Sequence, residues 1–91
     1  MSNLTCKVYE NKGNKVKVYF SYAKIIGIDM GNEYYITSEK YSVTTSKHTS
    51  FVQKNFPLNY TQKVNERKLN NLYAKMLPSS KILKTESVKT R

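Results

Sequence analysis

The sequence is poor in the residues on which most metal and cofactor sites depend. Its 91 residues include one cysteine, one histidine and six acidic residues. One histidine and one cysteine fall short of the four ligands of a structural zinc site, and no Asp-rich loop is present for calcium. We therefore expect no metal and no cofactor. Cys6 cannot form an internal disulfide, and its alternating apolar surroundings are typical of a buried thiol.

Glycine and long apolar runs are also scarce. The three glycines form neither a Walker loop nor a dinucleotide fingerprint, which removes the usual phosphate cradles of nucleotide hydrolysis. No run of about eighteen apolar residues exists, and the first residues lack the apolar core of a signal peptide. The expectation is a soluble protein that is not exported and has no membrane contact.

Acidic residues are rarest in the second half of the chain. The net charge is +10, and residues 44–91 carry +8 of it because ten Lys and Arg there face only Glu66 and Glu86. Such an asymmetry favours a phosphate backbone or an acidic protein surface as partner.

Alternating apolar residues predict four strands. Leu4, Cys6 and Val8 begin the pattern, and "NKGN" supplies the Gly and Asn that a tight hairpin turn requires. The predicted strands span about 4–9, 15–22, 24–29 and 33–38, joined as an antiparallel meander. Gly27, inside the third strand, predicts a bulge or the close approach of another element.

Beyond residue 43 the apolar period becomes helical. One helix is expected at about 46–55, ended by Pro57, and a second at about 62–77, capped by Thr61 and ended by Pro78. The prediction is one α+β domain over 1–77, a four-stranded antiparallel meander covered on one face by both helices. Residues 78–91 are expected to form a flexible basic tail.

The stretch "YSVTTSKHTSF" contains the only histidine. A nucleophile and base pair would need His48 beside a hydroxyl, with a third group orienting the imidazole, yet no acid lies between Lys40 and Asn65. The sequence therefore predicts no catalytic residue and no enzyme. The hydroxyls are interpreted as helix caps, and His48 as a residue that ties the first helix turn to the sheet or to a neighbouring backbone group. This makes the stretch a structural junction formed by Tyr41, Thr44, Thr45, Ser46 and His48.

Basic side chains on the two predicted helices are the main functional signal. Lys68 and Lys75 are seven residues apart and share a helical face. Stacking of bases on sheet tyrosines such as Tyr19 or Tyr35 is an alternative, although tyrosine commonly covers the face of a small sheet. The predicted nucleic-acid or partner contacts are Lys47, Lys54, Lys63, Arg67, Lys68 and Lys75.

Seven residues carry a resemblance to a known group of proteins. Ser21 and Tyr22 follow a strand, and Tyr41, Ser42, Thr44, Thr45 and His48 lead into a helix. This pattern, over roughly residues 15–56, resembles a family of small uncharacterised proteins of bacteriophages and plasmids. The resemblance implies no established activity, but it implies a mobile element acting in the cytoplasm of a bacterial host.

These observations predict a non-enzymatic, basic accessory protein of a phage or related element that binds DNA or RNA mainly through backbone charge. A second hypothesis is an inhibitor that binds an acidic or nucleic-acid-binding host protein. Such a target could be a defence system, as for an anti-CRISPR, or a polymerase or nuclease. A third hypothesis is a minor virion component.

Overall fold

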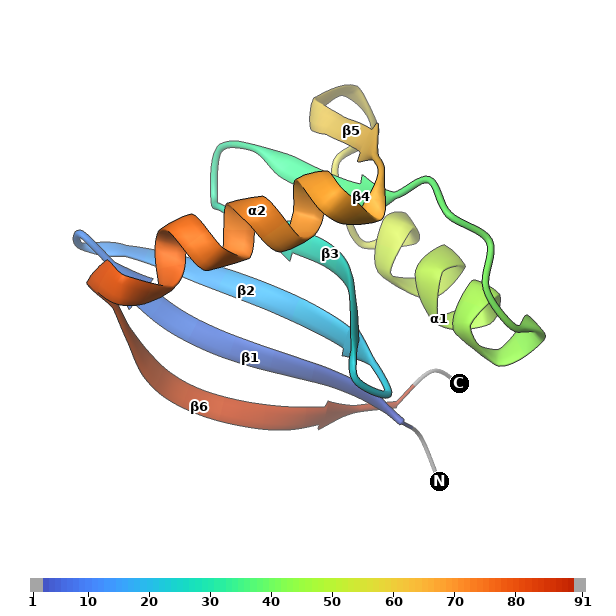
Figure 1. Cartoon of the computed structure of the whole chain (residues 1–91), viewed down its shortest axis with the longest axis horizontal. Helices are drawn as coiled ribbons and strands as arrows, with labels where there is room; N and C mark the ends of the chain where they lie inside the picture. The colour runs from blue at the N-terminus through green and yellow to red at the C-terminus, as the bar shows by residue number, and fades with distance from the viewer. Residues whose placement is uncertain (1–2, 90–91) are drawn as a thin grey trace.

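The computed structural model describes residues 3–89 and shows a six-stranded mixed sheet with two α-helices. The strand order is β5-β4-β3-β2-β1-β6, and neighbours are antiparallel except β4 and β5, which are parallel (Figure 1). The α+β class is confirmed, but the four-stranded meander is wrong. The elements are β1 (Leu4–Asn11), β2 (Asn14–Ser21), β3 (Lys24–Asp29), β4 (Tyr34–Thr37), α1 (Val43–Lys54), β5 (Thr61–Val64), α2 (Glu66–Met76) and β6 (Ser80–Val88), with single 3₁₀ turns at Leu58–Tyr60 and Leu77–Ser79.

The fifth strand occupies residues that were expected to begin the second helix. Thr61–Val64 pairs in parallel with β4, whose outer edge would otherwise lack backbone partners. The helix then begins after Asn65, whose side-chain oxygen accepts a hydrogen bond from the Lys68 amide at 2.8 Å. The cap is therefore Asn65 and not Thr61. The first residues of the expected helix are polar on all sides, so a helix there would have had no apolar face to bury against the sheet.

The expected flexible tail is wrong for residues 80–88. They form β6, which runs antiparallel to β1 from Asn11↔Ser80 to Leu4↔Val88. Most of its side chains are exposed, so backbone hydrogen bonds rather than apolar burial hold the strand. The low apolar content that suggested a mobile tail is thus a property of a strand at the edge of the sheet. Residues 1–2 and 90–91 lie outside the described part of the chain.

The two helices cover opposite faces of the sheet, so the expectation that both lie on one face is wrong. Side chains alternate between the faces of a strand. Tyr35 packs with Leu69 and Met76 of α2, whereas the next residue, Ile36, packs with Val52 of α1. In Figure 1, α2 lies in front of the sheet. Both faces of the central strands are therefore buried, each by one helix.

Helix α1 approaches the sheet closely at Gly27. A Cβ added there would lie 3.2 Å from Val52 Cγ1 and 3.3 Å from Ile36 Cδ1, closer than ordinary contact. The pairing of β2 with β3 also shifts register between Tyr19 and Phe20, which leaves Ile26 as an extra residue. Gly27 thus marks both a bulge and a close approach, as its place in the sequence predicts.

Candidate nucleic-acid interface

A buried polar cluster ties the start of α1 to the end of β2. Ser21 Oγ lies 2.7 Å from His48 Nδ1 and donates a hydrogen bond to Thr45 Oγ1 at 3.0 Å. All three side chains are buried. Buried polar groups are stable when they are hydrogen-bonded to each other, so this cluster fixes the position of α1 on the sheet.

The helix cap is Ser42, two residues before the run of Thr44, Thr45 and Ser46 that was expected to supply it. Ser42 Oγ accepts a hydrogen bond from the Thr45 amide at 3.2 Å, and α1 begins at Val43 rather than Ser46. Thr44 is exposed in the first turn. Ser42 could not be singled out as the cap from the sequence, because several neighbouring hydroxyls satisfy the same capping pattern.

Both side chains of the contact between Ser21 and His48 are buried. Ser21 is 1% exposed, and no carboxylate within residues 3–89 hydrogen-bonds to the imidazole. A nucleophilic serine must reach the reacting carbon, and its histidine is normally oriented by a third group. The geometry is that of packing. In the same described part of the chain, no three His, Cys, Asp or Glu side chains cluster as metal ligands would.

Stability should depend on pH through His48. Burial lowers the pKa of His48 below the 6.5 of an exposed histidine. The unfolded chain therefore binds a proton at a higher pH than the folded one, and the free energy of unfolding should fall as pH drops from about 7 towards about 5. Urea unfolding at several pH values measures this slope.

The His48→Gln variant is the control for that measurement, because it removes the only imidazole. The variant should show a nearly flat stability between about pH 7 and pH 5, because no histidine remains to titrate in that range. An unchanged slope in His48→Gln would contradict the assignment to His48.

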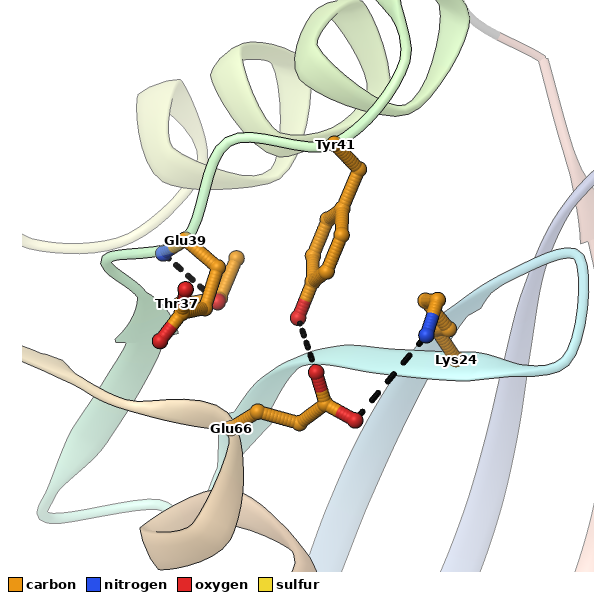
Figure 2. A network of polar contacts seen from close by, with 5 residues as sticks. All are labelled: Lys24, Thr37, Glu39, Tyr41 and Glu66. Carbon is orange, nitrogen blue, oxygen red and sulfur yellow. Dashed lines mark hydrogen bonds and ion pairs between the residues drawn. The ribbon is translucent and has the colours of Figure 1, made fainter.

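Tyr41 links the segment before α1 to the first residue of α2. Its hydroxyl donates to Glu66 Oε1 at 2.9 Å, and Lys24 Nζ lies 3.9 Å from Glu66 Oε2 and 5.1 Å from the centroid of the Tyr41 ring (Figure 2). Three distant segments of the chain meet at this point. The ring of Tyr41 is thereby fixed at its hydroxyl end.

Removing the Tyr41 hydroxyl should cost stability. Glu66 is 43% exposed, which weakens a bond to a charged acceptor, so Tyr41→Phe should lower the free energy of unfolding by about 1 kcal/mol. Tyr60→Phe is a matched control, because Tyr60 is 66% exposed and should show no change. Equal urea midpoints for Tyr41→Phe and wild type would show that the bond to Glu66 contributes nothing.

The six predicted basic contacts do not share one surface. Lys47 and Lys54 lie on α1, and Lys63 lies on β5 at one edge of the sheet. The other three lie on α2, over the opposite face: Arg67, Lys68 and Lys75. A single ligand patch can include one helix but not both.

The α1 lysines line a groove of about 640 Å³ on the outer side of that helix. Lys40, which is not among the six predicted contacts, also lines the groove because it lies in the segment that leads into the helix. No acidic residue lines the groove. We call this surface the lysine groove, and its lining residues are Lys40, Tyr41, Val43, Ser46, Lys47, Ser50, Phe51 and Lys54.

A second groove of about 350 Å³ shares residues with the first. Lys40, Ser46 and Ser50 line both, and Lys63 of β5 lines only the second. The structure thus associates three of the predicted contacts, Lys47, Lys54 and Lys63, with one side of the molecule. Glu39 also lines the second groove, which makes it less positive than the lysine groove.

The lysines of the groove are not neutralised by partners in the chain. Between residues 3 and 89 the ion pairs within 4.0 Å are Lys24–Glu66 and Lys84–Glu86. Lys40, Lys47 and Lys54 take part in neither. Their charge is available to an anionic ligand.

Comparison with known proteins gives a family but no function. A family model described as a family of unknown function, DUF8033, matches residues 1–71. The chain belongs to DUF8033. No curated protein and no solved structure matches it. The DUF8033 match confirms an uncharacterised family and extends beyond residues 15–56 at both ends, so it includes β1 and the first half of α2, while β6 lies beyond it.

The DUF8033 region contains the junction and the lysine groove completely. The sheet tyrosines considered for base stacking are less accessible. Tyr35 is 7% exposed and donates to Glu33 Oε1, and the ring of Tyr19 packs edge-on against Phe56. Tyr35 therefore presents no free ring face of the kind that stacking requires. The described residues also include no helix long and apolar enough to span a bilayer.

Proposed function

We propose that this chain is a non-enzymatic nucleic-acid-binding protein and that the lysine groove of α1 is its contact surface. One observation carries the proposal: Lys40, Lys47 and Lys54 line a single groove that has no acidic residue in its wall. Lysines bind phosphate oxygens as point charges, and the release of counterions from the nucleic acid drives such binding. Backbone charge would then dominate over base readout, because the groove contains no arginine.

The resemblance to phage and plasmid proteins supports a further part of the proposal. An accessory protein of a mobile element would act in the cytoplasm of a bacterial host, where nucleic acid is its most abundant polyanion. The junction of Ser21, Thr45 and His48 would hold the basic helix at a fixed angle to the sheet.

The test is the dependence of affinity on salt. With four lysine contacts, Lys63 included, affinity for a single strand should fall about 50-fold between about 50 and 200 mM salt, since each contact contributes roughly 0.7 to the logarithmic slope. Fluorescence anisotropy of labelled DNA and RNA measures it. The absence of any binding at the lowest salt would refute the proposal.

Exposed apolar side chains favour a second candidate, an inhibitor that binds a host protein. Leu58 is 82% exposed and Tyr60 is 66% exposed in the 3₁₀ turn before β5. Protein interfaces bury such side chains together with charged rims. If nucleic acid does not bind, while one host protein is captured in stoichiometric amount after nuclease treatment, this candidate replaces the first.

A further inference from the structure

We propose that the lysine groove takes a single-stranded nucleic acid, with bases stacked on Phe51 and Tyr41 and phosphates bound to the lysines. The inference rests on the proposed function and goes beyond it by naming the form of the ligand. A duplex presents phosphates and base edges, whereas a single strand also presents the apolar faces of its bases. The groove favours a single strand over a duplex because both apolar and basic side chains line it.

Apolar side chains line the groove together with the lysines. Tyr41, Val43 and Phe51 line it together with the three lysines, and Val43 is 74% exposed. Phosphate gains nothing from contact with such surface. A base gains by covering it, because stacking on an aromatic ring is favourable for every base. The groove therefore matches the two kinds of surface that a single strand carries.

The two rings are held in place before any ligand binds. The Tyr41 hydroxyl is fixed by Glu66, and the Lys24 ammonium group lies over the ring, 5.1 Å from its centroid (Figure 2). Phe51 packs against the apolar cluster that includes Val52 and Phe56. Rings that are already ordered lose little conformational freedom when a base stacks on them.

The spacing of the lysines suits a short stretch of strand. Val43, Lys47 and Lys54 follow one stripe of α1, opposite the buried stripe of Thr45, His48 and Val52. Lys47 and Lys54 are seven residues apart, or about 10 Å along the axis. Stacked nucleotides rise about 3.4 Å each, so this interval corresponds to about three nucleotides. We expect a site of about four nucleotides once Lys40 is included.

The experiment compares oligothymidylate of about 12 nucleotides with a duplex of equal length, at matched salt, using the full chain. Oligothymidylate should bind about tenfold tighter than the duplex. Phe51→Leu, which keeps apolar bulk but removes the ring, should weaken oligothymidylate binding about tenfold and leave its salt slope unchanged. Oligouridylate in parallel distinguishes DNA from RNA.

Two controls accompany that comparison. Tyr60→Leu removes an exposed ring outside the groove and should leave affinity unchanged. Because Phe51→Leu could perturb the fold, the wild-type chain provides an independent readout. Stacking should shift the ring protons of Phe51 and Tyr41 upfield on addition of oligothymidylate, and should do so less with the duplex.

The outcomes separate the inference from the function on which it rests. If the duplex binds as tightly as oligothymidylate and Phe51→Leu is neutral, the single-strand inference is wrong while nucleic-acid binding stands. If neither nucleic acid binds at low salt, both are wrong. If polyglutamate binds as tightly as oligothymidylate, the inference is wrong and an acidic protein partner is favoured.

Discussion

Replacing Lys40, Lys47 and Lys54 together with glutamine is expected to lower the affinity for single-stranded DNA about 100-fold at about 0.1 M salt. These three lysines line the groove on α1 and have no acidic partner within the described chain. Each lost phosphate contact removes roughly 0.7 from the logarithmic salt slope, so the slope should fall by about 2. Anisotropy titrations over a salt series give both quantities.

The matched comparison is a second triple variant with the same change in net charge. Arg67→Gln, Lys68→Gln and Lys75→Gln alter the helix on the opposite face of the sheet. A localised site predicts a much smaller loss for this variant, arising only from the reduced overall charge. Equal losses for the two triple variants would mean that binding is diffuse and that the lysine groove is not the site.

The second large effect concerns stability. Gly27→Val should lower the free energy of unfolding by about 3 kcal/mol, because it forces branched carbons into a contact that is already tight. Even a Cβ would lie 3.2 Å from Val52 Cγ1, 3.3 Å from Ile36 Cδ1 and 3.4 Å from Phe56 Cε2. Urea unfolding followed by circular dichroism measures the change.

A double-mutant cycle isolates the steric cause. Gly27→Ala should cost about 1 kcal/mol in the wild-type background. In a Val52→Ala background the nearest atom is gone, so the same change should cost little or should stabilise by filling the space. Purely additive free energies would show that the penalty at Gly27 does not come from crowding against α1.

Local patterns predicted the strands and turns that involve neighbouring residues. Period-two alternation indicated β1 to β4, and the "NKGN" turn is confirmed by the positive φ angles of Lys12 (51°) and Gly13 (86°). The elements that were missed depend on distant partners. Half of the side chains of β5 and most of those of β6 are exposed, and neither strand carries a clear alternation of its own. Their backbone partners are β4 and β1, and the residues of β5 and β6 alone do not indicate these pairings.

The face of the sheet that each helix covers also could not be predicted from the local sequence pattern. Both faces of the meander carry apolar and tyrosine side chains, so each helix could have covered either. The insertion of β5 between the two helices decides it, because β4, α1 and β5 form a parallel crossover on one face and α2 then returns over the other. This arrangement divides the basic residues between two faces.

Within the candidate site, the sequence indicated Lys47 and Lys54 from their charge but not Lys40, Val43 or Phe51. Lys40 precedes the helix, and its place in the groove depends on the path of the segment from β4 to α1. Phe51 lies in a helix whose apolar residues suggested only a core. One feature of the sequence could have indicated that Phe51 lines a surface groove. It lies one position away from the buried stripe of α1 and has Lys47 and Lys54 on either side.

The pairing of β1 with β6 has a consequence during synthesis. Leu4 pairs with Val88, so the first and last described strands lie side by side, although almost the whole described chain separates them (Figure 1). While the ribosome extends the chain, β1 can pair with β2, but its other edge stays open until residue 88 has left the exit tunnel. The outer edge of β1 therefore stays unpaired from its own synthesis until residues 80–88 have emerged, which is the longest delay between any two paired strands of the described sheet.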